Sequence, residues 1–235
     1  MKKLTTLEKG ILIGCIGLLF IAIFIELKPN RFYSLLDTND LSYKNKSILI
    51  VSPLLTANAY KVGGFYTYYL GRCDDTCLSV QIDNKTRYGY TSSLQSLVRF
   101  DALGANIITD YQLTENPAIL KKFDKIILLH NEYVTRELFD AIIDHPNVIY
   151  MYPNSLYAEV KISNGTMTLV RGHAYPEQSV DNGFDWEYDN TRPEEFRLCD
   201  DTLQWIKVDN GIQLDCYPEK YVINNTKIFK YIRDV

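Results

Sequence analysis

The residues of this chain best suited to acid–base chemistry follow a buried apolar run near its centre. Residues 126–129 are apolar, and His130, Glu132 and Tyr133 come directly after them in the segment HNEY. An imidazole or a carboxylate at such a place can act as a general base or orient a substrate. The alternative is that His130 and Glu132 only cap the next helix or hydrogen-bond a loop, and their spacing alone does not decide between the two.

The elements that would position these side chains alternate between strands and helices. Four short β-branched or apolar runs predict strands, and they are separated by segments with apolar residues at helical spacing. The predicted strands cover residues 47–53, 106–110, 125–130 and 147–153, and the predicted helices cover residues 94–102, 117–123 and 135–142. This alternation predicts an α/β fold, with a mostly parallel sheet flanked by helices on both faces.

The carboxyl ends of parallel strands meet at one edge of a sheet, where ligands of open α/β folds bind. Polar residues that follow the predicted strands should therefore share one crevice. The residues expected along it are Tyr60, Asp110, His130, Glu132, Tyr133 and Asn154.

The pattern changes after residue 155. Residues 156–162 and 166–171 flank an Asn-Gly pair, a signal for a tight β-hairpin, and a second hairpin is predicted around residues 209–211. The polar and aromatic segment between them has the length and composition of a functional or lid loop.

The N-terminus predicts a membrane anchor. Residues 10–25 contain sixteen consecutive residues without a charge, close to the length that spans a bilayer. No cleavage site of the small-x-small kind follows, which argues against a removed signal peptide. We therefore expect a single-pass protein of the cell membrane. Its parts are a cytoplasmic tail at residues 1–9, an anchor at residues 10–27, a stalk at residues 28–46 and an extracytoplasmic domain at residues 47–235.

Cysteines and glycosylation triplets agree with that orientation. Four cysteines lie beyond the anchor and allow three pairings, of which the most local joins Cys73 to Cys77 and Cys199 to Cys216. A zinc site is the competing interpretation, although Cys-x3-Cys without a second close pair is weak evidence for one. The four Asn-x-Ser/Thr acceptors are Asn45, Asn84, Asn164 and Asn224.

Several classes of function are disfavoured. The net charge is −4 and no basic block occurs, so nothing indicates a nucleic-acid partner. The chain has no Gly-x-Ser-x-Gly elbow, no phosphate-binding glycine loop and no His-Glu-x-x-His helix. No cysteine occupies a predicted strand-to-helix turn, which argues against thiol amidotransferase chemistry.

Three segments resemble one known family in the right order. The C-terminal domain of the N,N-dimethylformamidase large subunit and its relatives has segments similar to TANAYKVGGFYTYY, HNEYVT and YPNSLYAEV of this chain. The resemblance covers residues 47–162. It implies a glutamine-amidotransferase-like α/β fold. The best-known member of that family hydrolyses a small amide at a mononuclear iron held by two tyrosines and a glutamate.

By that resemblance, Tyr133 is a possible ligand of iron or another divalent metal, and Glu187 is the candidate for the later glutamate. Asn131 and Val134 stand where the family has Asp and Trp. The implied activity is metal-assisted hydrolysis of a C–N bond, with His130 or Glu132 assisting. The alternative is a non-catalytic surface module whose tyrosine-rich crevice binds glycan or a cell-surface protein.

Overall fold

The computed structural model describes residues 41–189 and 197–235 of the chain. The predicted anchor at residues 10–27 lies outside these residues. Among the described residues, no helix is both long and apolar enough to cross a membrane. The compact unit begins at Ser42, earlier than the predicted domain boundary at residue 47. The reason is Tyr43, which is 1% exposed and donates a hydrogen bond of 2.6 Å to the carbonyl oxygen of Phe229.

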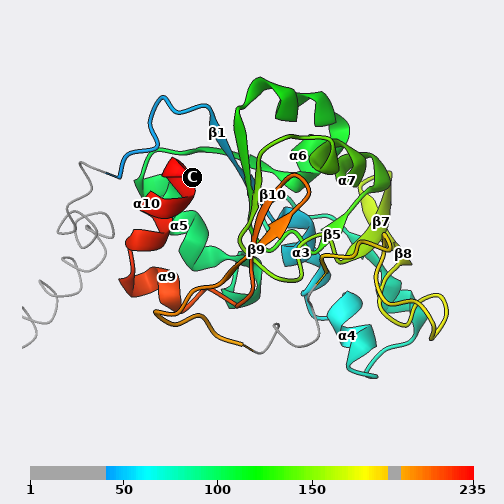
Figure 1. Ribbon diagram of the computed structural model, residues 1–235. Helices are drawn as coiled ribbons and strands as arrows, with labels where there is room; N and C mark the ends of the chain where they lie inside the picture. Colours follow the sequence, from blue (N-terminus) through cyan, green and yellow to red (C-terminus); the bar gives the residue numbers. More distant parts are fainter. Residues whose placement is uncertain (1–40, 190–196) are drawn as a thin grey trace, which may run out of the picture. The chain divides into compact units, whose positions relative to one another are not determined.

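A mixed six-stranded sheet forms the centre of this unit (Figure 1). Its strand order is β3-β1-β4-β6-β10-β9, with every neighbouring pair parallel except β10 and β9. The strands are β1 (Ile48–Ser52), β3 (Asn106–Thr109), β4 (Lys125–Leu128), β6 (Val148–Tyr150), β9 (Trp205–Val208) and β10 (Gly211–Leu214). The four predicted strands are therefore present, and the hairpin predicted around residues 209–211 extends the same sheet.

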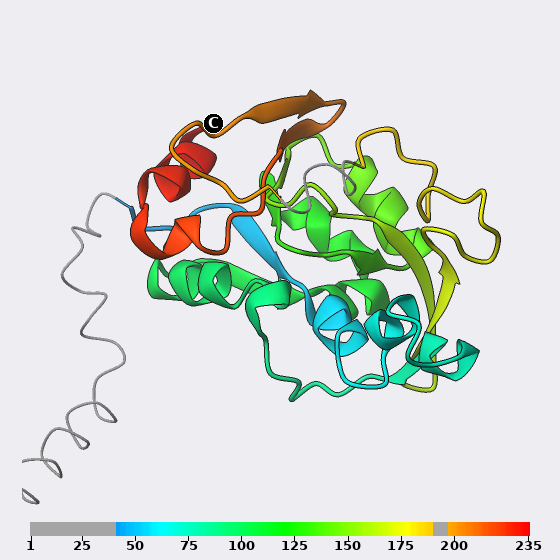
Figure 2. The same cartoon turned by 90° about the horizontal axis from the view of Figure 1, so that it is seen from below.

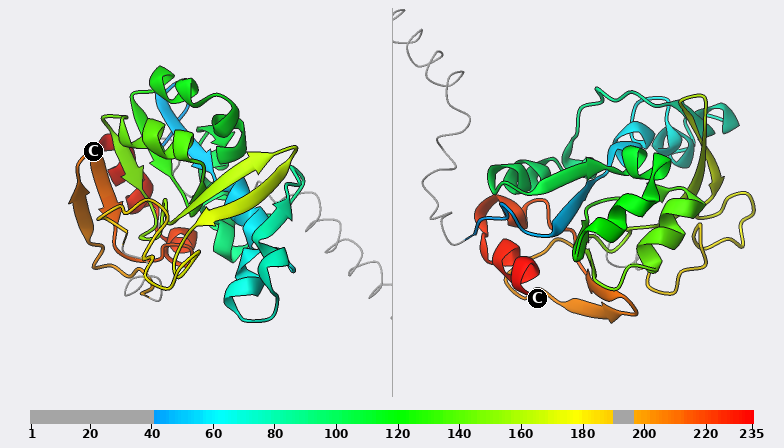
Figure 3. Two further views of the ribbon diagram at one scale, coloured as in Figure 1. Left: turned by 90° about the vertical axis from the view of Figure 1, so that its right-hand side faces the viewer. Right: turned by 90° about the horizontal axis from the view of Figure 1, so that it is seen from above.

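A second sheet has four strands in the order β2-β8-β7-β5. Its strands are β2 (Ser79–Gln81), β5 (Tyr133–Val134), β7 (Ala158–Ser163) and β8 (Thr166–Arg171). The β7–β8 hairpin turns at Asn164 and Gly165, as the Asn-Gly signal predicts, and Figure 3 shows its two strands side by side. β5 pairs in parallel with β7, so the segment after His130 belongs to a sheet and not to a loop.

Helices cover the main sheet on both sides, which confirms the predicted α/β class (Figures 1 and 2). α6 and α7 lie on one side, and α5, α9 and α10 gather on the other. The α-helices are α3 (Leu54–Ala59), α4 (Phe65–Tyr69), α5 (Leu94–Ala102), α6 (Asp110–Glu115), α7 (Arg136–Ile143), α9 (Tyr221–Asn224) and α10 (Lys227–Asp234). The 3₁₀ helices are η2 (Asp75–Leu78), η3 (Tyr90–Ser92) and η4 (Pro117–Lys122).

Strand alternation divides the core between these two layers of helices. In β4, Ile126 and Leu128 face the cluster that includes Leu138 of α7. Lys125 points to the opposite side, where its ammonium donates hydrogen bonds to carbonyl oxygens at the end of α10, including that of Ile232 at 3.0 Å. Both faces of the strand are therefore buried, as its unbroken apolar run requires.

Helix ends follow the signals in the sequence. Thr135 caps α7, because its hydroxyl accepts a hydrogen bond of 3.3 Å from the backbone N–H of Leu138. Gly104 follows α5 with φ of +73°, the left-handed conformation that glycine adopts at little cost. In its described parts, residues 172–189 and 197–204, the segment after β8 contains no helix and no strand longer than a single bridge.

Candidate functional site

His130 lies just beyond the carboxyl end of β4, and its side chain is fixed in one tautomer. The residue is 2% exposed, and its backbone N–H donates to the hydroxyl of Ser93 at 3.0 Å. The ring nitrogen Nδ1 lies 2.5 Å from the carbonyl oxygen of Thr91. Because a carbonyl oxygen can only accept, Nδ1 carries the proton, and the Nε2 of the neutral ring presents a lone pair.

Aromatic rings enclose the imidazole. The ring of His130 stacks on Tyr152 with centroids 5.0 Å apart, and Tyr217 meets it edge-on at 5.4 Å. Tyr60 lies on a further side at 6.1 Å. Burial lowers the pKa of His130 to about 4, although the contacts with Thr91 and Asn154 act in the opposite direction. The ring is therefore neutral at physiological pH.

The carboxylate of Glu132 faces this imidazole. Its Oε2 atom lies 3.8 Å from the Nε2 of His130, which is too long for a direct hydrogen bond. The backbone N–H of Glu132 donates to the hydroxyl of Thr56 at 3.0 Å, which fixes the residue against α3. Phenol groups surround the carboxylate, and its charge adds to burial in raising the pKa values of Tyr69 and Tyr133.

Asn154 lies beside His130 and Glu132, and its side chain is buried. The residue is 1% exposed, and neither its Oδ1 nor its Nδ2 has a hydrogen-bond partner among the described residues. Its amide lies beside His130 and affects the pKa of that ring. Most buried polar groups in folded proteins are paired, so an unpaired amide here needs an explanation. The structure thus brings together His130, Glu132 and Asn154.

The ring of Tyr133 packs in an apolar cluster, while its phenol interacts with the charge of Glu132. Its ring packs against Phe65 at 5.1 Å and against Tyr157 at 6.5 Å, both edge-on. Glu187 is exposed, and its charge acts on the neighbouring Tyr188. No hydrogen bond, ion pair or electrostatic interaction between described residues joins Tyr133 to Glu187. The metal site that the family resemblance implies at these two residues stays a prediction, and we derive no step through a metal held by it.

Asp110 is buried beneath the site and uses its oxygens inside the fold. Its Oδ1 accepts hydrogen bonds from the backbone N–H groups of Leu55 at 3.0 Å and Tyr111 at 2.9 Å, and its Oδ2 accepts from the amide of Asn131 at 3.1 Å. Burial raises the pKa of Asp110 to about 7, although these hydrogen bonds oppose the rise. Asp110 thus links the ends of β3 and β4 to α3.

A polar cleft opens beside the imidazole. It has a volume of about 480 Å³, and both Tyr60 and Thr91, which contact His130, lie in its wall. Three cationic side chains and one carboxylate line it, namely Lys61, Lys85, Arg87 and Asp83. The size suits a small molecule, and the charges favour an anionic or strongly polar one.

A buried network behind the imidazole has no counterpart in the sequence prediction. The carboxylate of Glu219 accepts hydrogen bonds from the hydroxyls of Tyr152 at 2.6 Å and Ser96 at 2.8 Å. Ser93, which the backbone of His130 contacts, begins α5 with φ of +62°. The Ser-Ser pair before a helical pattern could have predicted this helix start, whereas no local signal points to Glu219.

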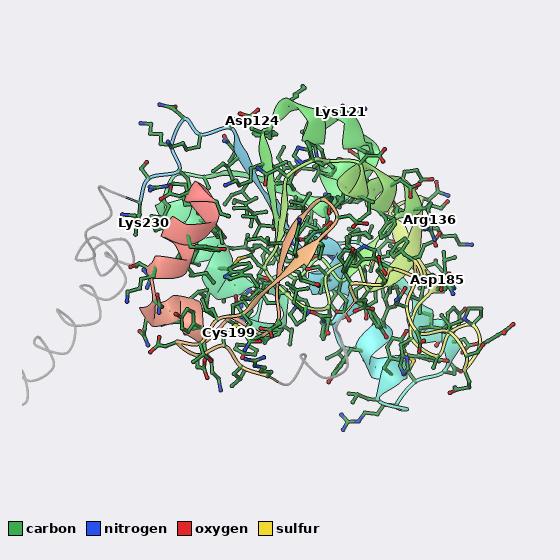
Figure 4. All side chains as sticks on the ribbon, viewed as in Figure 1. Lys121, Asp124, Arg136, Asp185, Cys199 and Lys230 are labelled. Carbon is green, nitrogen blue, oxygen red and sulfur yellow. A yellow bond between two sulfur atoms is a disulfide. The ribbon has the colours of Figure 1, made fainter. Side chains whose placement is uncertain are left out.

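Both predicted disulfides are present. Cys73 is bonded to Cys77, and Cys199, labelled in Figure 4, is bonded to Cys216. The most local of the three possible pairings is therefore confirmed. The four predicted glycan acceptors, Asn45, Asn84, Asn164 and Asn224, are all exposed.

Comparison with models of protein families finds no match to this chain, and comparison with curated proteins also finds none. Membership of the N,N-dimethylformamidase-like family therefore stays a prediction that rests on the three sequence segments.

Proposed function

We propose that the compact unit, residues 42–235, forms the outer domain of a single-pass membrane protein, and that this domain hydrolyses the C–N bond of a small amide. The observation that carries the proposal is the buried group at the carboxyl end of β4. There the Nε2 of His130 faces the Oε2 of Glu132 at 3.8 Å, beside the amide of Asn154. The Nε2 of His130 and the amide of Asn154 are buried without a hydrogen-bond partner among the described residues, and such groups lower stability unless a ligand engages them, so they indicate function.

Each side chain has a role that its chemistry allows. A histidine with a pKa of about 4 is a weak base, so His130 accepts a hydrogen bond from the attacking water and orients it. Glu132 takes the proton as the water oxygen bonds to the carbonyl carbon. The Nδ2 of Asn154 donates to the oxygen on which negative charge develops. Glu132 then returns the proton to the leaving nitrogen as the C–N bond breaks, giving a carboxylic acid and an amine.

The setting of the domain agrees with an outer location. Disulfides persist in oxidising compartments, and this chain has two of them beyond the predicted anchor at residues 10–27. In this proposal residues 1–9 are cytoplasmic, and the fold is glutamine-amidotransferase-like. The α/β architecture and the position of the site beyond parallel strands support that assignment.

The test is hydrolysis by the full chain purified in detergent. Formamide, acetamide and N,N-dimethylformamide are supplied as substrates, and released ammonia or amine is measured. Loss of the proton acceptor in Glu132→Gln should lower the rate by about 100-fold or more. Glu177→Gln is the matched control, because Glu177 is exposed and remote in sequence from the site. Equal rates for wild type and Glu132→Gln would refute the mechanism, and no turnover of any amide would refute the activity.

One observation favours a second function, the binding of glycan without catalysis. Tyr60, in the wall of the cleft, stacks on Tyr66 with centroids 5.0 Å apart, and Tyr66 is 44% exposed. Exposed tyrosine faces combine apolar area with a polar hydroxyl, which suits the faces of sugar rings. Binding of the full chain to an array of glycans, lost in Tyr66→Ala and unaffected in Glu132→Gln, would support this function in place of hydrolysis.

A further inference from the structure

Three potential donor atoms, one nitrogen and two oxygens, lie together in the buried group. His130 supplies an imidazole nitrogen, Glu132 a carboxylate oxygen and Asn154 an amide oxygen, and all three residues are at most 5% exposed. They come from the ends of β4 and β6, which are adjacent parallel strands of the main sheet. The framework that holds them is therefore rigid, as a specific ligand site requires.

The hydrogen bonding of His130 is that of a metal-binding histidine. Such residues donate one ring N–H to a carbonyl or carboxylate, which fixes the tautomer and directs the other nitrogen to the metal. Here Nδ1 donates to the carbonyl oxygen of Thr91 at 2.5 Å. The Nε2 atom is buried and has no hydrogen-bond partner among the described residues.

The separation of the atoms fits a shared cation better than a direct contact. Metal ions such as zinc bind nitrogen and oxygen ligands at about 2.0–2.2 Å, so two ligands of one ion lie about 3 to 4 Å apart. The 3.8 Å between Nε2 of His130 and Oε2 of Glu132 lies in this range and exceeds hydrogen-bonding distance. The Oδ1 of Asn154, which has no hydrogen-bond partner among the described residues, can supply the third ligand to the same ion.

We infer that His130, Glu132 and Asn154 together bind a divalent transition-metal cation, with positions left open for water or substrate. This inference concerns the pocket of the proposed hydrolase, but it requires no catalysis. It differs from the metal site that the family resemblance implies, because that site would use Tyr133 and Glu187. No set of three His, Cys, Asp or Glu residues in the described ranges can hold a metal ion, and the third ligand inferred here is an amide.

The choice of cation follows from the donor set. An imidazole with two oxygen donors suits zinc, iron or cobalt, whereas magnesium and calcium prefer sites built from oxygen alone.

Zinc and cobalt binding to the full chain in detergent provides the test. After treatment with a chelator, the wild type should bind one equivalent of Zn²⁺ by calorimetry, and Co²⁺ should give a visible d–d absorption. His130→Gln should lower the affinity at least about 10-fold. Asn154→Asp should raise it, because a carboxylate is a stronger ligand than an amide. Tyr133→Phe and Glu187→Gln should leave it unchanged.

The inference can still be tested if one of these variants folds poorly. Circular dichroism identifies a misfolded variant, and Asn154→Asp predicts a gain that misfolding cannot produce. Wild-type protein that binds neither metal, or an affinity that falls in Tyr133→Phe or Glu187→Gln but not in His130→Gln, would overturn the site. Metal binding without amide hydrolysis would refute the proposed function alone, and hydrolysis by a protein that binds neither Zn²⁺ nor Co²⁺ would refute the metal site alone.

Discussion

The carboxylate of Glu219 accepts a 2.6 Å hydrogen bond from the hydroxyl of Tyr152, whose ring stacks on His130. The same carboxylate accepts the backbone N–H groups of Gln95 at 3.0 Å and Ser96 at 3.3 Å in the first turn of α5. Glu219 is fully buried. One carboxylate therefore accepts the free backbone N–H groups at the start of α5 and also holds Tyr152 against the imidazole of His130.

Replacement of Glu219 by glutamine should destabilise the domain. The amide keeps one acceptor oxygen but places an NH₂ group where a second donor already points, so at least one buried hydrogen bond is lost. We expect the free energy of unfolding in urea to fall by about 1–3 kcal/mol. Glu177→Gln, at an exposed site, is the control and should change it by less than about 0.5 kcal/mol. Equal effects of the two substitutions would contradict this role of Glu219.

Asp110 should make stability depend on pH. Its pKa in the folded state is about 7, above the value of about 3.9 in an unfolded chain. A carboxyl with a raised folded pKa stabilises the fold fully below the unfolded pKa, and this contribution is lost as pH rises through the folded pKa. Between pH 4 and 7, the wild type should lose about 1.4 kcal/mol for each unit of difference between the two pKa values.

The measurement compares unfolding curves of the wild type and Asp110→Asn from pH 4 to pH 8. Other carboxyl groups titrate in both proteins, so the difference between the two stabilities isolates Asp110. The asparagine variant also loses the hydrogen bond to Asn131, which lowers its free energy of unfolding by the same amount at every pH and leaves the pH dependence unchanged. Two parallel curves across this range would show that Asp110 is ionised throughout.

Gly211 should not tolerate a side chain. It is the first residue of β10 and pairs with Val148 of β6, and a Cβ atom added to it would collide with the backbone of Val148. Gly211→Ala should therefore cost about 1–3 kcal/mol or prevent folding. Gly89→Ala is the matched control, since no atom lies within 4 Å of its added Cβ and its φ is −125°. Thermal unfolding of the two variants separates them, and equal melting temperatures would argue against this strand pairing.

The two disulfides should differ in their contribution to stability. The Cys199–Cys216 bond joins residues 17 apart in sequence, and the Cys73–Cys77 bond joins residues 4 apart. In the chain-entropy description these loops correspond to about 3 and about 2 kcal/mol. Serine double mutants of each pair, unfolded in urea, should therefore show the larger loss for the longer loop. A larger loss for the short loop would reverse this order.

Much of the fold could be predicted from the sequence because its signals are local. The apolar runs at β1 and β4, the Asn-Gly turn after β7 and the cap at Thr135 each depend on neighbours within a few residues. The pairing of β10 with β6 could not be predicted, because it joins Gly211 to Val148, 63 positions earlier in the chain, and depends on which sheet edge is open.

The candidate site was partly predictable for the same reason. Parallel strands place the residues that follow them along one edge, so His130, Glu132 and Asn154 could be expected together. The packing of the Tyr133 ring could not be predicted, because it depends on β5, a strand of two residues that pairs with β7. The ring consequently lies in the second sheet's core.

The place of β10 inside the main sheet has a consequence for synthesis of the protein. β6 pairs with β4 on one edge, but its other edge is covered only by residues 211–214. While a nascent chain emerges from the ribosome, this buried apolar strand keeps an unpaired edge until residues 211–213 of β10 appear. Open edges of this kind recruit other chains. Aggregation during expression should therefore compete with folding, and lower expression temperature or dilute refolding should improve the yield of the folded protein.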